Sequence, residues 1–331
     1  MRPWMTRRDF LAQSGSCAAH LALAAAAVPL SARAMWARSS YGTVVASEPF
    51  GSLERIHENI WALISTPLSG DFTTVSNGGI IAGRNAVLAI EGFNAPAGAA
   101  WLGARARELT GRWPTHIAIT HYHSDHANGV AGYLGEAIKP VVRATDVTRS
   151  LIFEKNLPAD SSRSAALQDA VLLSPTESTD LDLGGRRVRI VPRSGHTPSD
   201  VSLELDEPGV VFCGDLVWNG MFPNYVDAVP TRLSRSARAL RRTRDSVYVP
   251  GHGALARAPE FDRYLAVIDE LEHAARAAHE KGVSAPDAGA SFMLPPALGA
   301  WTLFNKVFFE RAFAAWYREL DHPPSPPGDS R

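Results

Sequence analysis

The sequence is poor in cysteine, with only Cys17 and Cys213 among its 331 residues. Cys17 falls in an N-terminal segment that we expect to be removed, so the mature protein would keep one thiol. A single thiol excludes an internal disulfide framework. We interpret Cys213 as a buried structural thiol, since a free cysteine packs like a small apolar side chain.

The sequence also lacks an excess of charge of either sign. It has 33 lysines and arginines against 34 aspartates and glutamates, which gives a formal net charge of −1. This balance argues against nucleic acid or an anionic membrane surface as a partner. The hydrophobic content of 45% and charged content of 20% are ordinary for a soluble globular protein. The partner that we expect is a small-molecule substrate.

No apolar run is long enough for a comfortable membrane span, the longest being the alanine-rich Leu21–Leu30. Before it, Thr6–Leu11 (TRRDFL) resembles a twin-arginine export signal, and after it Ala32–Ala34 resembles an A-x-A cleavage site. We therefore predict that residues 1–34 are a twin-arginine signal peptide and that the mature protein is periplasmic. Only the signal would contact a membrane; the alternative is an amphipathic N-terminal helix.

What the sequence does have is a dense histidine cluster. His121, His123, Asp125 and His126 lie within six residues, directly after the apolar run Ile117–Ile119. That run predicts a short buried strand, and two-residue spacing places His121 and His123 on one face at its end. Imidazole nitrogen and carboxylate oxygen are ligands that Zn²⁺ accepts. The order H-x-H-x-D-H thus predicts a metal site.

Three further residues of ligand type follow predicted strands downstream. His196 follows Val188–Val191, Asp215 follows Gly209–Phe212, and His252 follows Val247–Val249. Each lies in a glycine-containing turn, in the segments Gly195–Thr197, Cys213–Asp215 and Pro250–Gly253. Repeated placement of such residues at strand ends indicates that the strands bring them to one site.

With these elements in this order, the chain resembles the metallo-β-lactamase-fold hydrolases from about residue 55 to about residue 255. The resemblance implies an α/β fold, a four-layer αββα sandwich. It implies one metal on His121, His123 and His196 and a second on Asp125, His126 and His252. Asp215 would bridge the two, which makes Cys213 the less suitable ligand. In the family the second strand of the opening hairpin usually ends in aspartate, whereas this chain has Glu91.

The chemistry implied by the resemblance is hydrolysis. Two ions that share a water lower its pKa and give a hydroxide nucleophile, while one ion polarises the attacked carbonyl. Asp125 is the catalytic candidate because its carboxylate can hold or receive the proton of that water. Two Zn²⁺ ions per chain fit the mixed ligand set best, although iron or manganese can occupy similar sites.

The resulting prediction is an exported zinc-dependent hydrolase of an ester, lactone, thioester or amide. The bridging aspartate favours the glyoxalase II-like and lactonase-like members. One alternative is a β-lactamase, which the periplasmic address would suit. A second alternative is a periplasmic protein that resembles the mono-iron persulfide dioxygenases or is associated with quinoprotein or sulfur-oxidation systems. A third is a non-catalytic binding module that a metal stabilises.

The rest of the chain is expected to divide as follows. Residues 35–284 form the catalytic domain, 285–322 a helical extension packed on it, and 323–331 a disordered tail. Periodicity predicts helices over 96–109, 130–134, 145–156, 234–244, 260–280 and 301–320. Residues 35–52 are expected to be an exposed lead-in, residues 55–64 one strand, and residues 157–175 a mobile loop. Trp218, Asn219, Phe222 and Tyr225 are candidates either for the pocket wall or for loop packing.

Overall fold

The computed structural model describes residues 41–135, 139–156 and 160–322. The predicted signal peptide and the predicted disordered tail lie outside the described residues. Among the residues described, no helix combines the length and the apolar character needed to cross a membrane.

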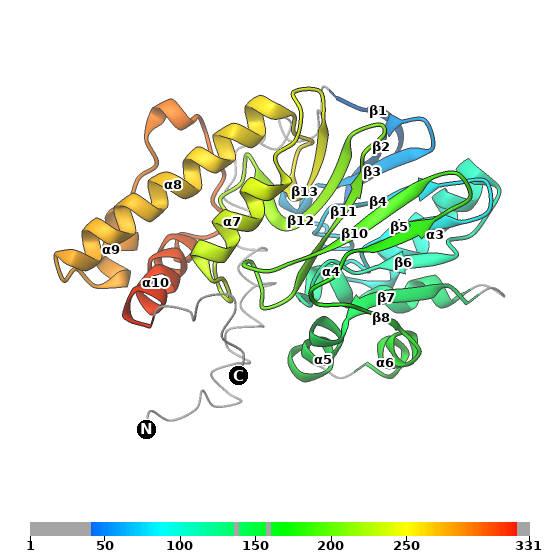
Figure 1. Cartoon of the computed structure of the whole chain (residues 1–331), viewed down its shortest axis with the longest axis horizontal. Helices are drawn as coiled ribbons and strands as arrows, with labels where there is room; N and C mark the ends of the chain where they lie inside the picture. Colours follow the sequence, from blue (N-terminus) through cyan, green and yellow to red (C-terminus); the bar gives the residue numbers. More distant parts are fainter. Residues whose placement is uncertain (1–40, 136–138, 157–159, 323–331) are drawn as a thin grey trace.

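Two β-sheets form the centre of the molecule (Figure 1). The first sheet has eight strands that pair in chain order, antiparallel from β1 to β5 and parallel from β5 to β8. Its strands are β1 (Thr43–Glu48), β2 (Gly51–His57), β3 (Ile60–Ser65), β4 (Gly78–Ala82), β5 (Val87–Ile90), β6 (His116–Ala118), β7 (Val141–Thr145) and β8 (Val171–Leu173).

The second sheet has the strand order β13-β12-β11-β10-β9. All its pairs are antiparallel except β12 with β13. Its strands are β9 (Thr179–Asp182), β10 (Arg187–Arg193), β11 (Asp200–Leu205), β12 (Val210–Asn219) and β13 (Val247–Gly253). The parallel pair matters for function because it places the ends of two strands side by side.

Helices cover the outer face of each sheet (Figure 1). Those on the first sheet are α3 (Pro96–Thr110), α4 (Ser124–Ala127), α5 (Asp146–Lys155) and α6 (Ser161–Gln168). Those on the second are α7 (Pro230–Leu240) and α8 (Ala258–Glu280), with α9 (Ala285–Ser291) and α10 (Val307–Asp321) packed beyond them. Short 3₁₀ helices are η1 (Pro67–Ser69), η2 (Val130–Gly135) and η3 (Pro296–Leu298).

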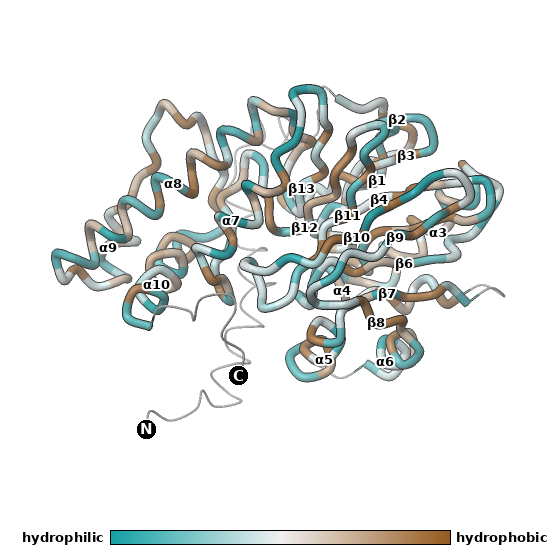
Figure 2. Tube along the Cα trace, viewed as in Figure 1, coloured by the Kyte–Doolittle hydropathy of each residue, from teal (hydrophilic) through white to brown (hydrophobic). Residues whose placement is uncertain are grey.

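Three apolar layers separate the four structural layers. One lies between α3 and the first sheet, with Leu102 and Ile117 among its members. A second joins the two sheets, where Ile81 and Phe212 belong to the same buried cluster. The third lies between the second sheet and α7, α8 and α10, and includes Trp316. Figure 2 shows hydrophobic stretches, drawn in brown, along strands and helices of these layers. The predicted four-layer αββα sandwich is therefore confirmed.

Several local predictions need correction. The prediction of a mobile loop over 157–175 is wrong for the described residues 160–175, which contain α6 and β8. The Asp160 side chain accepts hydrogen bonds from the backbone N–H groups of Ser162 and Arg163 and so caps α6. The lead-in carries β1 and the start of β2, and β1 lies at the sheet edge with most of its residues exposed. The single strand over 55–64 is two strands, since Asn59 adopts φ 59° in the turn between them.

Helix boundaries differ in three places. The predicted helix over 234–244 begins at Pro230 and ends at Leu240. Residues 130–135 are a 3₁₀ helix. The last helix begins at Val307, because residues 301–304 instead run beside the loop after β12, where Met221 and Thr302 form a parallel bridge. The helices over 96–109, 145–156 and 260–280 lie within about two residues of their predicted positions.

Candidate metal centre

The candidate metal centre lies where strands of both sheets end. His121 and His123 follow β6, His196 follows β10, and Asp215 and His252 lie within the paired strands β12 and β13. Gly251 lies directly against Asp215, so closely that a Cβ atom there would fall 1.9 Å from Asp215 Oδ1. Only glycine therefore lets β13 pass close enough to bring His252 to the same carboxylate.

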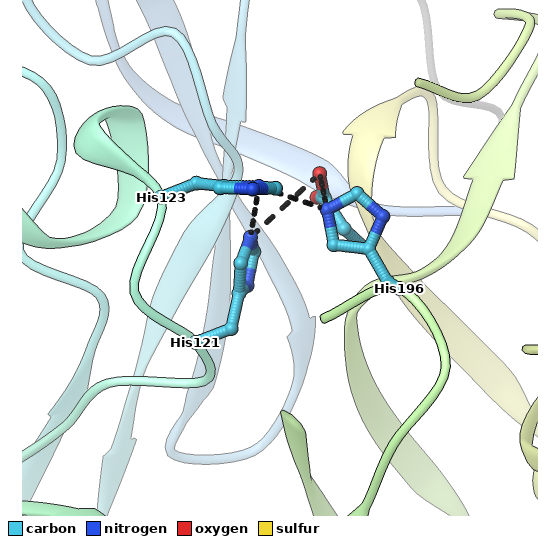
Figure 3. A group of neighbouring side chains, drawn as sticks. His121, His123 and His196 are labelled. Atoms are coloured by element: carbon cyan, nitrogen blue, oxygen red, sulfur yellow. Dashed lines mark hydrogen bonds and ion pairs between the residues drawn. The ribbon is translucent and has the colours of Figure 1, made fainter. Parts of the chain in front are cut away.

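The first ligand group consists of His121, His123, His196 and Asp215. The three rings converge from loops on two sides of the site (Figure 3). His123 Nδ1 lies 3.2 Å from His121 Nε2 and 3.0 Å from His196 Nε2. Asp215 Oδ2 lies 3.2 Å from His196 Nε2. Tetrahedral zinc bound at 2.0–2.1 Å separates its ligand atoms by about 3.3 Å, so these spacings fit such an ion.

The second group consists of Asp125, His126 and His252. His252 Nε2 lies 3.3 Å from Asp125 Oδ2, and His126 Nε2 lies 3.7 Å from the same oxygen. Asp215 Oδ1 faces this group at 3.1 Å from His126 Nε2 and 3.4 Å from His252 Nε2. Asp215 thus presents one oxygen to each group, and all seven predicted residues are brought together.

Two buried atoms that face each other between the two groups, His126 Nε2 and Asp215 Oδ1, have no hydrogen-bond partner among the described residues. A buried polar atom without a partner is costly, by about 1–3 kcal/mol. Both atoms are of metal-ligand type and face each other across the group. The residues present therefore fit a divalent cation that would satisfy them.

The charges around the histidines favour a cation at this position. Burial disfavours the imidazolium of His126, but the carboxylates of Asp215, Glu91 and Asp125 outweigh burial and raise its pKa well above the usual value. For His252, burial is likewise outweighed by Asp215 and Asp125, and the pKa rises to about 9. Carboxylates that stabilise a protonated imidazole also stabilise a metal ion in its place.

The tautomers of two histidines are set by Glu91, a residue whose contact with the site the sequence did not reveal. His126 Nδ1 lies 3.0 Å from Glu91 Oε1 and donates to it. Thr120 Oγ1 donates to the same oxygen at 2.5 Å, so it must accept from His121 Nδ1, 3.0 Å away. In the neutral imidazoles that a metal requires, both Nε2 atoms then keep lone pairs that face the two ligand groups.

A second carboxylate, Asp227, does the same for His123. Its Oδ2 accepts from His123 Nε2 at 3.1 Å and from the Tyr122 hydroxyl, which leaves His123 Nδ1 free as a ligand. Lys155 Nζ lies 3.7 Å from Asp227 Oδ1. Burial raises the pKa of Asp227, but the hydrogen bonds from His123 and Tyr122 and the charge of Lys155 outweigh burial and keep that pKa below its usual value.

The centre opens to solvent on one side. The side chains of His123 and Asp125 are 16% and 22% exposed, whereas those of the other five residues are at most 5% exposed. Asp125 is also ionised at neutral pH: burial raises its pKa, but His126 and His252 outweigh burial and lower it to about 2. A carboxylate at the open side that can accept a proton is suited to a reaction with water.

The aromatic residues after Asp215 are packing residues. Trp218, Phe222 and Tyr225 are buried in the apolar cluster between the second sheet and its helices. Trp218 lies against the ring of His252, with ring centroids 4.1 Å apart, and so supports a ligand from behind. Cys213 is buried and belongs to neither ligand group.

Comparison with protein families matches residues 92–252 to the metallo-β-lactamase superfamily. Among curated relatives, the hydroxyacylglutathione hydrolase of Idiomarina loihiensis is 24% identical over 126 residues, 38% of this chain and 42% of the relative. That of Parasynechococcus marenigrum is 24% identical over 155 residues, 45% of this chain and 54% of the relative. The chain thus spans about half the length of these relatives.

Solved structures show the same fold. A metallo-β-lactamase from Erythrobacter litoralis superposes with a TM-score of 0.55 at 18% identity, over 68% of this chain and 99% of that chain. The inverting sec-alkylsulfatase Pisa1 from Pseudomonas sp. superposes with a TM-score of 0.66 at 14% identity, over 94% of this chain and 64% of that chain. The second likeness extends over nearly the whole chain and so takes in most of its C-terminal helical part.

Proposed function

We propose that the chain is a metal-dependent hydrolase of the metallo-β-lactamase superfamily that binds two Zn²⁺ ions; the match of residues 92–252 to that family supports the proposal. The observation that carries the proposal is the position of Asp215, whose two oxygens face separate groups of ligand-type side chains. His121, His123 and His196 would hold one ion and Asp125, His126 and His252 the other. Asp215 would bridge them.

Metal ions held there would supply an activated water and polarise the carbonyl that it attacks. The protein's own side chains accept the proton and hold the catalytic residue in place. The Asp125 carboxylate accepts the proton that the water loses when its oxygen adds to the carbonyl carbon. Ser76 Oγ donates to the backbone carbonyl of Asp125 at 2.7 Å and holds this residue in place. Collapse of the tetrahedral adduct breaks the bond to sulfur or oxygen, and the leaving thiolate or alkoxide takes the proton held by Asp125 to depart as the thiol or alcohol.

We place the substrate among thioesters and esters rather than β-lactams. The curated relatives are named hydroxyacylglutathione hydrolases, which cleave a thioester bond by name. The bridging position is occupied by the aspartate expected of the glyoxalase II-like members. The structural likeness to metallo-β-lactamases supports the fold and leaves the bond that is cleaved to be decided by the site.

This proposal is tested with a substrate panel. The purified protein is assayed on an S-acyl glutathione, a lactone, a nitrocefin-type β-lactam and a secondary alkyl sulfate. We expect turnover of the thioester or lactone, loss of that turnover after chelation, and its return when Zn²⁺ is added back. Hydrolysis that persists without metal, or turnover of the lactam alone, would contradict the assignment.

We further propose that the protein is exported to the periplasm through its twin-arginine signal. The support is the Arg7-Arg8 pair, the apolar segment after it and the Ala32–Ala34 site. Joint replacement Arg7→Lys and Arg8→Lys should retain the protein in the cytoplasm, as measured by cell fractionation. The variant Arg2→Lys, which leaves the pair intact, should be exported normally. Normal export of the double variant would refute the signal.

A further inference from the structure

A surface cavity of about 370 Å³ lies apart from the metal centre, behind the loop that carries His196. It is formed by three parts of the chain: the end of β10 with the loop after it, the outer side of α7, and Val147 with Pro175 from the other half of the sandwich. None of its lining residues belongs to the seven ligand-type residues of the centre.

The cavity is lined by cations and hydroxyl groups. Arg193, Arg235, Ser194, Ser199 and Ser236 contribute its polar side chains, and no lining residue is acidic. Groups of this kind bind carboxylate and phosphate oxygens. The remaining lining is apolar and consists of Val147, Ala239 and three prolines, Pro175, Pro192 and Pro198.

The donors that remain available can be counted from the hydrogen bonds. Arg193 donates from Nε to Ser202 at 3.3 Å and from one terminal nitrogen to Glu204 at 2.8 Å, so three of its five N–H groups remain. Arg235 makes no hydrogen bond or ion pair within the described part of the chain. The Ser236 hydroxyl donates a hydrogen bond to the backbone carbonyl of Ser194 at 2.7 Å, so it has no further proton to donate to a ligand. The arginines are therefore the main donors.

The charge of Arg193 is balanced, whereas that of Arg235 is not. The Glu204 carboxylate forms ion pairs with Arg193 and Arg242, and Asp206 forms a second ion pair with Arg242. Arg235, which has no ion-pair partner in the described part of the chain, thus adds a positive charge to a cavity that Arg193 also lines. An anionic group in this cavity would meet guanidinium donors from β10 and from α7.

We propose that this cavity binds the carboxylate or phosphate group of a small organic anion, whose apolar part packs against the prolines. The size supports an organic ligand, since cavities above about 300 Å³ are typical of small-molecule sites. The bound anion would contact Ser194, two residues before His196, without reaching the metal centre. The proposal is independent of the reaction catalysed at that centre.

The test is a titration of the zinc-loaded protein with phenyl phosphate, benzoate and inorganic phosphate, followed by calorimetry at constant ionic strength. We expect one of the two organic anions to bind more tightly than inorganic phosphate, and Arg235→Gln to weaken this binding at least about tenfold. Arg232→Gln is the matched control, because Arg232 is an exposed arginine of the same helix outside the cavity. It should bind like the unmodified protein.

Three results would overturn the proposal. One is equal binding of inorganic phosphate and both organic anions, which would leave no role for the apolar lining. Another is equal weakening by Arg232→Gln, which would indicate a general charge effect. The third is binding that survives Arg235→Gln but disappears on chelation, which would place the anion on the metals. Arg235 is exposed, so its replacement should leave the melting temperature unchanged.

Discussion

Asp215→Asn is expected to lower the metal content from two ions per chain to one or fewer. An amide of the same size offers one neutral oxygen in place of two anionic ones, so only one ligand group keeps its oxygen donor. The other group receives an NH₂ aimed at the cation. Loss of a supporting residue around a metal costs 10–100-fold, and loss of a shared ligand should lower kcat/KM by more than about 100-fold. Elemental analysis and steady-state kinetics measure both effects.

Asp227→Asn is the matched control for this variant. Asp227 lies beside His123 but belongs to neither ligand group. Its replacement by asparagine removes the same negative charge as Asp215→Asn does. We expect this variant to keep two ions at saturating Zn²⁺, with weaker affinity for one of them. If Asp215→Asn also retained two ions and full activity, Asp215 would not bridge the groups.

Glu91→Gln is expected to weaken both metal sites on the order of 10–100-fold. Glu91 Oε1 fixes the Nδ1–H tautomer of His126 directly and that of His121 through Thr120. An amide nitrogen at that position would donate towards His126 Nδ1 and favour a proton on Nε2, where it blocks the metal. If the amide oxygen takes the position of Oε1 instead, the NH₂ group takes the position of Oε2. There it faces the backbone N–H of Thr120, which then has no acceptor. Competitive chelator titration measures the affinity.

Glu204→Gln separates this effect from the general loss of a buried carboxylate. Glu204 is also buried, and it pairs with Arg193 and Arg242 away from the metal centre. Its replacement should lower the melting temperature and leave metal affinity unchanged. Equal metal affinity in Glu91→Gln and the unmodified protein would show that Glu91 does not set the tautomers.

The parts of the fold that the sequence predicts well are those with long periodic patterns. The 23 residues of α8 repeat their apolar positions often enough to be recognised. The strands β1, β8 and β9 are short or lie at sheet edges, and exposed residues on them carry no clear alternation. Their pairing depends on neighbours far along the chain, which a local pattern does not contain.

Some residues of the candidate site could be predicted from the sequence, and others could not. The seven ligand-type residues could be predicted because each lies in a recognisable turn at a strand end. Glu91 and Asp227 could not, since they reach the histidines only through the folded backbone; Asp227 is 104 residues from His123. The arrangement of strand ends brings these carboxylates to the outer nitrogens of the rings. Supporting contacts of this kind are a property of the fold and not of the motif.

The most direct test of two bridged metal sites is the metal content of the purified protein, measured by elemental analysis alongside protein concentration. We expect two zinc ions per chain in the unmodified protein. A single iron per chain, with no hydrolysis of any substrate in the panel, would contradict it and would instead favour oxidative chemistry at a mononuclear site.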